Sequence, residues 1–277
     1  MELLYYYALA HQDSFDVRWI NAESIAKKLF EPLSQRLISE HQLRVLGGTL
    51  ATSLRFAPGT SQINTVGIQS VTTGKTDCIQ NVDAVVLAVG SKGIRSIMSQ
   101  SPECQEAAPE LVAAGSLGAI DVVSVRLWLD RYVPIPYPAN VFSRFESLQG
   151  AGGTFFMLDQ LQSKAEQALW GGSEPQGSVI ASDFYNASKI ALMEDQAIIE
   201  LLTQQLLPIS DPRFKEATVL DSEVQRYPNA VSLFSPGSFK QRPPLETSVA
   251  SIVCAGDWVR MGAQEHGAKG LCQERAY

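Results

Sequence analysis

Two short apolar runs, each ending at a glycine, constrain the fold of this chain more than any other feature. The first covers residues 81–90 (NVDAVVLAVG) and the second residues 251–256 (SIVCAG), which Asp257 follows. Continuous β-branched runs of this length are typical of parallel strands buried on both faces, and such strands occur in α/β proteins. We therefore predict an α/β fold of the mixed α+β kind, with both runs as buried strands.

The spacing of apolar residues divides the rest of the chain into helices and antiparallel strands. A helix is predicted over residues 21–38, with a kink or a break at Pro32, and another over residues 189–207, ended by Pro208. The polar, proline-rich stretch that follows, up to residue 250, carries no strand signal, and a last helix is predicted over residues 267–276. Alternation of apolar and polar residues predicts strands over residues 63–71, 77–80, 121–129, 155–158 and 179–185.

Composition excludes several classes of function. The 277 residues carry 22 Lys and Arg against 29 Asp and Glu, a formal net charge of -7, which argues against binding to nucleic acid or to anionic lipid by charge. The four cysteines and three histidines lack the close spacing of a structural metal site, so no metal is predicted. No run reaches the roughly 20 apolar residues of a membrane span, and the N-terminus lacks the basic region of a signal peptide.

The second apolar run places a carboxylate where α/β sheets bind ligands. Asp257 follows Gly256 at the carboxyl end of the strand, and Gly267–Ala268 opens the predicted last helix ten residues later. A carboxylate that accepts from sugar hydroxyls, beside the free amides of a helix N-terminus, suits a nucleotide with polyol and pyrophosphate parts. The alternative is an ordinary strand, turn and helix in which Asp257 caps the turn.

These segments together resemble the C-terminal part of flavin-containing amine oxidases and of phytoene and ζ-carotene desaturases. The resemblance rests on residues 253–257 (VCAGD) with Gly267–Ala268, and on residues 81–90. It also rests on residues 225–230 (QRYPNA) with the following SPG, and on the helix ending at Pro208. These segments occur in the family's order, and together they extend over most of the chain.

The resemblance implies FAD as the cofactor and assigns residues to it. Gly256 and Asp257 would meet the ribityl chain, and His266, Gly267 and Ala268 would bring backbone amides to the pyrophosphate or to the flavin. Leu50 and Ala51 would lie near the adenine through their backbone. His266 is interpreted either as a proton carrier near the flavin or as a packing residue at the start of the helix.

The resemblance also implies an incomplete Rossmann-type FAD-binding domain and a substrate domain with a mixed or antiparallel sheet and helices. We expect residues 42–101 and 251–277 to form parts of the FAD-binding domain, residues 102–250 the substrate domain, and residues 1–41 a helical segment of the substrate domain. The chain departs from the family pattern in three ways. It contains no G-x-G-x-x-G turn, His266 stands where the family usually has Glu, and Leu271–Cys272 replaces a small Ser-Gly pair.

The predicted function is an FAD-dependent oxidoreductase that dehydrogenates a lipophilic small molecule, in a truncated form. No catalytic residue is assigned, because the sequence shows no acid–base pair and in such enzymes the flavin performs the redox step. The alternative is a non-catalytic fragment that cannot hold FAD alone. Peripheral contact with a membrane for substrate access is a further expectation. The compartment is expected to be the plastid in a photosynthetic eukaryote and otherwise the cytoplasm.

Overall fold

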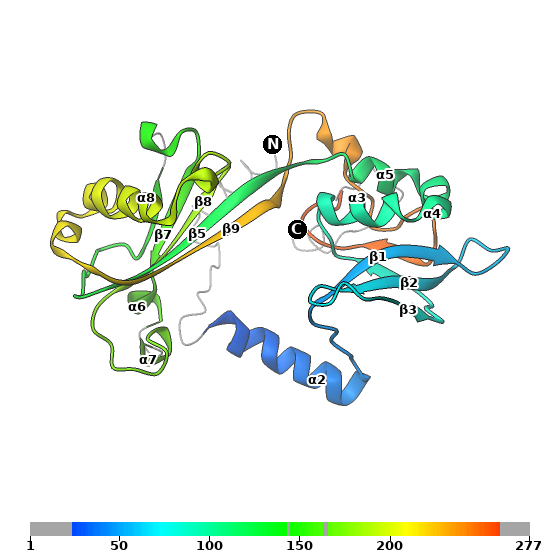
Figure 1. Ribbon diagram of the computed structural model, residues 1–277, viewed down its shortest axis with the longest axis horizontal. Helices are drawn as coiled ribbons and strands as arrows, with labels where there is room; N and C mark the ends of the chain where they lie inside the picture. The colour runs from blue at the N-terminus through cyan, green and yellow to red at the C-terminus, as the bar shows by residue number, and fades with distance from the viewer. Residues whose placement is uncertain (1–23, 143–144, 163–165, 261–277) are drawn as a thin grey trace, which may run out of the picture.

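The computed structural model describes residues 24–142, 145–162 and 166–260. They form two lobes joined by the long pair of strands β5 (Gly118–Leu129) and β9 (Val219–Leu233), as Figure 1 shows. Helices occur together with antiparallel and parallel strand pairs, which confirms the predicted mixed α/β class.

The smaller lobe contains two sheets and three helices around one core. A three-stranded antiparallel sheet has the order β1-β2-β3, and the parallel pair β10-β4 forms a separate sheet. The elements are β1 (Thr49–Phe56), β2 (Ile63–Ser70), β3 (Thr76–Gln80), β4 (Val85–Leu87), α3 (Ser91–Ser99), α4 (Pro102–Ala107), α5 (Pro109–Ala114) and β10 (Ile252–Cys254). Leu54, Ile94, Leu111, Ile252 and Trp258 are among the buried residues of this core.

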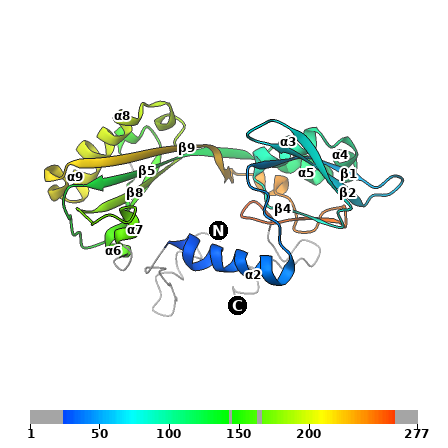
Figure 2. The ribbon, with the colours of Figure 1, turned by 60° about the horizontal axis from the view of Figure 1, so that its bottom comes forward.

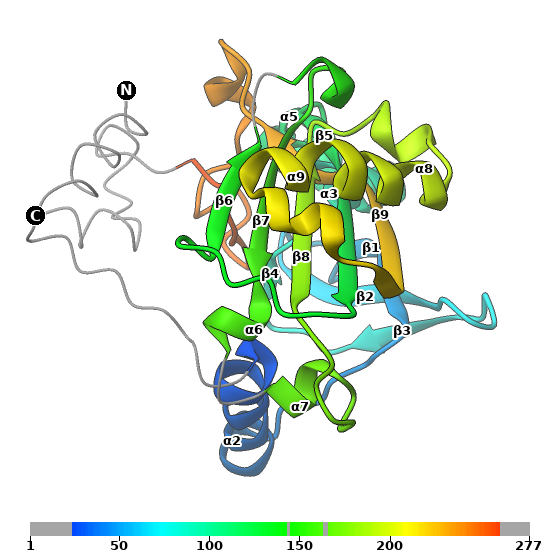
Figure 3. The same cartoon turned by 90° about the vertical axis from the view of Figure 1, so that its left-hand side faces the viewer.

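The larger lobe is a five-stranded antiparallel sheet with the order β6-β7-β8-β5-β9, covered by helices on one face (Figure 3). The core between sheet and helices includes Phe155 from β7, Phe184 from β8 and Leu202 from the covering helix. The further elements of this lobe are β6 (Ala139–Phe142), η2 (Glu146–Leu148), β7 (Gly152–Met157), α6 (Leu158–Leu161), α7 (Glu166–Leu169), β8 (Val179–Tyr185), η3 (Ile190–Leu192), α8 (Asp195–Glu200), η4 (Leu201–Leu206), α9 (Leu207–Ser210) and η5 (Pro212–Glu216). The short helix η6 (Ser238–Gln241) follows β9 and contacts α5 of the smaller lobe.

The change from one core to the other falls near residue 117. Cys104, Leu111 and Leu117 pack in the smaller core, whereas the larger core begins at Val123. The domain boundaries expected from the sequence place residues 102–117 with the substrate domain, and these residues instead pack beside β1 and α3. The assignment of each lobe to FAD or to substrate stays a prediction.

Two helices contain a proline where the sequence predicts a kink or an end, and both pass through it. The first consists of the π-helical turn η1 (Ala26–Phe30) and α2 (Glu31–His41), with Pro32 in its first turn. The residue before each proline donates its amide five residues back, Glu31 to the carbonyl of Ala26 and Leu207 to that of Leu202. The wider π turn accommodates the missing proline N–H, so the prediction that Pro208 ends its helix was wrong.

Strand β9 is the element that the sequence prediction missed. It is an edge strand, and its pairing with β5 has a bulge between Ile120 and Val122. Pro228 and Asn229 lie in this bulge, where the residues have no partner in the ladder with β5 and a proline without an N–H fits. The Asn229 amide donates instead to the Asp121 carboxylate at 2.8 Å. An edge-strand bulge tolerates proline, so Pro228 does not end the strand. The 15-residue strand was not predicted because its residues are mostly polar or exposed.

Helix α2 lies beneath the two lobes in Figure 2, and neither it nor η1 contains a buried residue. Ile25, Leu29, Phe30 and Leu33 are each about half exposed. In the part of the chain that the structure describes, no helix combines the length and the apolar character needed to cross a bilayer.

Candidate functional site

The two apolar runs, each predicted to be a parallel strand, pair with each other in parallel. In the ladder, Ile252 lies opposite Val85, Val253 opposite Val86, and Cys254 opposite Leu87. The Ala255 amide then donates to the Leu87 carbonyl at 3.0 Å, which extends the pairing by one step. Their carboxyl ends therefore meet at the same edge, where open α/β sheets bind ligands.

The prediction that this pair is buried on both faces was wrong for β4. Leu87 is buried, but the side chain of Val86 is 64% exposed. Strand β4 has β10 as its single neighbour in the described sheet, so the face that carries Val86 is not packed. A continuous apolar run predicts a strand. Whether each face of that strand is buried depends on the neighbouring strands and helices, which the run itself does not specify.

The edge presents an exposed carboxylate next to a helix start. Helix α3 begins at Ser91, after Gly90 with its extended backbone (φ -75°, ψ 179°), and no side chain caps its N-terminus. On the neighbouring strand, Gly256 takes a φ of +115° and leads directly to Asp257, which is exposed. A carboxylate acceptor and uncapped helix amides are thus brought to one edge.

Trp258 belongs to the core and not to the surface of this edge. Its side chain is 1% exposed, and its indole N–H donates to the Ala255 carbonyl at 2.8 Å. Trp258 therefore packs in the core of the smaller lobe. The indole also leaves little room for a side chain at position 256, because a Cβ added to Gly256 would lie 3.0 Å from Trp258 Cδ1.

An arm formed by residues 242–249 supports β10 and the turn after it. The Cys254 amide donates to the Leu245 carbonyl at 2.8 Å, and Glu246 and Val253 form an isolated antiparallel bridge. Farther along, the Arg260 amide donates to the Pro243 carbonyl at 2.7 Å. The arm runs along the side of β10 opposite to β4, so the segment that carries Asp257 is held from both sides.

The described residues at this edge fit part of a flavin nucleotide. Asp257 supplies the acceptor that a ribityl hydroxyl requires, and a Cβ added at Gly90 would meet open space. The G-x-G-x-x-G turn that would bind a pyrophosphate does not occur in the sequence. The fit therefore extends to the polyol part of the nucleotide and to an anion at the start of α3.

The other predicted site residues lie elsewhere or outside the described residues. Leu50 and Ala51 are exposed in β1, opposite Gln69 and Ile68 of β2, and their sheet is separate from β4 and β10. Their role near an adenine stays a prediction. His266, Gly267 and Ala268 fall outside the described residues.

Buried thiols and metal ligands do not add chemistry to this edge. Cys254 is fully buried in β10, and burial raises the pKa of its thiol to about 12, with a smaller contribution from Glu110. Burial likewise raises the pKa of Cys104 to about 11. Such thiols stay protonated at neutral pH and are poor nucleophiles. No group of three or more His, Cys, Asp and Glu side chains that could hold a metal occurs among the described residues.

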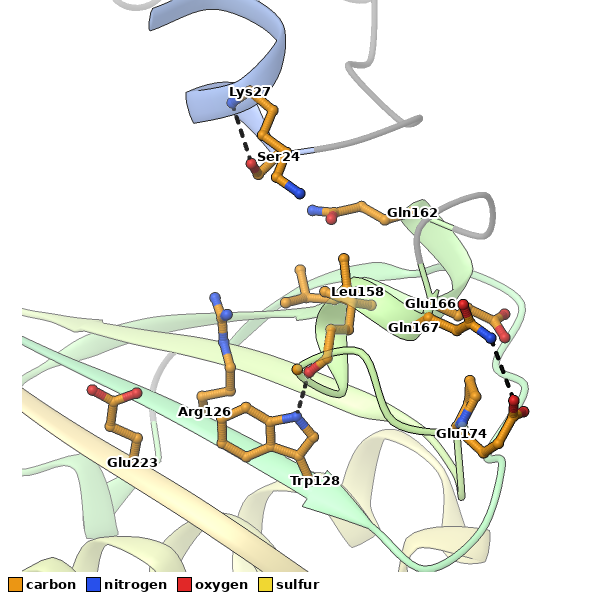
Figure 4. A pocket seen from close by; sticks show the side chains of 14 residues that line it. Ser24, Lys27, Arg126, Trp128, Leu158, Gln162, Glu166, Gln167, Glu174 and Glu223 are labelled. Atoms are coloured by element: carbon orange, nitrogen blue, oxygen red, sulfur yellow. Dashed lines mark hydrogen bonds between the residues drawn. The ribbon is translucent and has the colours of Figure 1, made fainter. Parts of the chain in front are cut away.

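A second candidate surface is the face of the five-stranded sheet that α8 and α9 leave uncovered. Arg126 and Trp128 of β5 point to this face, opposite Glu223 and Asp221 of β9. They border a cavity of about 1020 Å³ that α6, α7 and the start of η1 close (Figure 4). The Trp128 indole N–H donates to the Leu169 carbonyl at 2.8 Å, which holds α7 over the sheet. The cavity has both polar and apolar walls, lined by Ser24, Lys27, Arg126, Trp128, Leu158, Gln162, Glu166, Gln167, Ala168, Leu169, Gly171, Glu174, Pro175 and Glu223.

Comparison with known proteins gives a relative that aligns along most of the chain. A carotenoid phi-ring synthase of Streptomyces griseus is 26% identical over 243 residues, which are 87% of this chain and 43% of the relative. The resemblance predicted from the sequence is confirmed. The chain is similar to the flavin amine oxidase and carotenoid desaturase family and spans less than half the length of this relative. No family model matches the sequence.

Solved structures with a similar arrangement were also found. A putative protoporphyrinogen oxidase from Exiguobacterium sp. 255-15 matches with a TM-score of 0.47 and 13% identity, over 83% of this chain and 46% of that chain. A cyclohexylamine oxidase from Brevibacterium oxydans matches with a TM-score of 0.44 and 12% identity, over 76% of this chain and 42% of that chain.

Proposed function

We propose that this chain supplies part of the flavin site and the substrate-facing sheet of an FAD-dependent oxidoreductase. The observation that carries the proposal is the parallel β4–β10 pair, at whose carboxyl edge Gly256 presents the exposed Asp257 carboxylate. The collinear resemblance described above supports it as well. When bound, FAD would supply the redox chemistry.

The residues of this chain would bind and orient the nucleotide. Asp257 would accept hydrogen bonds from the ribityl hydroxyls, and the amides around Gly267 and Ala268 would meet the pyrophosphate or the flavin. Leu50 and Ala51 would lie near the adenine, and His266 would stand at the start of the last helix. No catalytic acid or base is assigned to this chain.

We propose a lipophilic substrate, placed between the flavin and the open face of the five-stranded sheet. A relative named as a carotenoid phi-ring synthase supports this choice of substrate class. Residues 102–250 would then form the substrate domain, apart from residues 102–117, which pack in the smaller core.

A second proposal is that the chain cannot hold FAD without a partner segment. The 64% exposed Val86 favours it, since parallel strands are ordinarily covered on both faces. The absence of a G-x-G-x-x-G turn from the sequence favours it too.

An absorbance spectrum of the purified chain tests both proposals. Bound flavin gives a yellow protein, and added FAD should be retained through gel filtration if the first proposal holds. Asp257→Asn should then reduce retention, whereas Asp77→Asn, which changes an exposed carboxylate in β3, should not. A colourless chain that retains no added FAD contradicts the first proposal and supports the second.

A further inference from the structure

Arg242 binds the turn that carries Asp257 from the side of the arm. Its Nε donates to the Trp258 carbonyl at 3.1 Å, and its Nη2 donates to the carbonyls of Asp257 at 2.9 Å and Val259 at 2.5 Å. Three successive carbonyls thus converge on one guanidinium group. The guanidinium carbon lies over the Phe234 ring, 4.3 Å from its centre, in a cation–π contact.

This arrangement restrains the backbone that carries the Asp257 side chain. A carbonyl bound to a rigid, planar donor fixes the peptide plane to which it belongs, and two such planes flank Trp258. Because Gly256 permits many backbone conformations, the turn needs a constraint on its far side to hold one of them. The arginine supplies a constraint of this kind through the backbone, since the three bonds to the turn go to main-chain carbonyls.

We infer that Arg242 is a positioning residue, which holds the Asp257 carboxylate in the orientation that binds a flavin ribityl chain. The inference rests on the proposed function, because the ligand of Asp257 is the one proposed there. A positioning role for Arg242 differs from a purely structural role in one measurable respect. A structural role predicts the same loss of flavin affinity whether or not Asp257 is present, whereas a positioning role predicts that the loss depends on Asp257.

The first measurement requires no flavin. Hydrogen–deuterium exchange is followed at the amides of Val259 and Arg260, which bond to the carbonyls of Gly256 and Pro243. In Arg242→Gln we expect exchange at these amides to rise by roughly tenfold or more, because the turn opens locally. Arg226→Gln is the matched control. Arg226 bonds the carbonyls of Ala191 and Met193 and the Asp195 carboxylate on the surface of the larger lobe, and its loss should leave the turn unchanged.

The second measurement is a double-mutant cycle of FAD affinity with Arg242→Gln, Asp257→Asn and both together. We expect Arg242→Gln to weaken binding roughly tenfold in the native background and less than about twofold in Asp257→Asn. Arg242→Lys keeps the charge but lacks the planar fork, so it should restore less than half of the lost affinity on a logarithmic scale. It also replaces Arg242→Gln if that variant does not fold.

The outcomes separate the inference from the proposed function. Unchanged exchange at Val259 and Arg260 overturns the inference, and so does an equal loss of affinity in both backgrounds. If none of the proteins binds FAD, the proposed function fails for the isolated chain. The exchange measurement then still decides whether Arg242 orders the turn of Asp257.

Discussion

Replacing Gly256 by alanine tests whether the turn after β10 has the conformation that the site requires. Its φ of +115° lies outside the regions that residues with a Cβ adopt readily. The new Cβ would also lie 3.0 Å from Cδ1 and 3.3 Å from Nε1 of Trp258. That indole is 1% exposed and bonded to the Ala255 carbonyl, so it has little room to move.

The expected loss follows from these two effects. A residue with a Cβ held in such a conformation costs about 1–3 kcal/mol, and crowding a packed side chain costs about 1–3 kcal/mol more. The reduced entropy of the unfolded chain offsets about 0.4–1 kcal/mol. We therefore expect Gly256→Ala to lower the free energy of unfolding by about 2–4 kcal/mol, which corresponds to roughly 4–16 °C in Tm for a chain of this size.

Two other glycines separate the contributions in the same denaturation assay. Gly59 has a φ of +73°, and a Cβ added there would meet open space, so Gly59→Ala measures the backbone cost without crowding, about 1–2 kcal/mol. Gly47 has neither a positive φ nor a neighbour within 4 Å of an added Cβ, and Gly47→Ala should change stability by less than about 1 kcal/mol in either direction. If Gly256→Ala costs no more than Gly59→Ala, the reasoning about Trp258 is refuted.

Three further predictions concern the larger lobe. Phe155→Ala should cost about 3–5 kcal/mol in urea denaturation, because the ring is fully buried, whereas the half-exposed Phe239 should tolerate alanine. Burial raises the pKa of Asp159, so the stability of the native protein relative to Asp159→Asn should fall as pH rises from below 3.8 through that raised pKa. Hydrogen bonds from Arg213 lower the pKa of Asp211 to about 2, so relative to Asp211→Asn stability should fall as pH drops from 3.8 towards 2. Equal slopes for the two aspartates would contradict both assignments.

The sequence predicts those strands in which apolar and polar residues alternate in step with buried and exposed positions. The predicted range 179–185 coincides with β8, in which every second residue from Ile180 to Phe184 lies against the core. Strand β9 gives no such signal because both its faces carry polar or exposed residues, and Pro228 suggests a loop. Its strand structure is imposed by pairing with β5, which is information from distant residues.

The candidate site is predictable to the same limited degree. The glycine and the carboxylate after an apolar strand are local features, and the structure places them at the edge of the parallel pair. The contact of Arg242 with carbonyls 15 to 17 residues away leaves no mark in the sequence, because backbone acceptors exist at every position. The exposure of Val86 is likewise set by neighbouring strands and not by the residue itself.

One continuous stretch of chain connects the five-stranded sheet to the turn of Asp257. Strand β9 leaves the edge of that sheet at Leu233, and the next residue, Phe234, supports the guanidinium of Arg242. The arm of residues 242–249 runs antiparallel beside β10, and Arg242 at its start binds the turn that comes after β10. Along this path a displacement of β9 reaches Phe234 first, then η6, which contacts α5, and then Arg242. If the sheet binds substrate and the turn binds flavin, this stretch is the shortest covalent route by which one could affect the other.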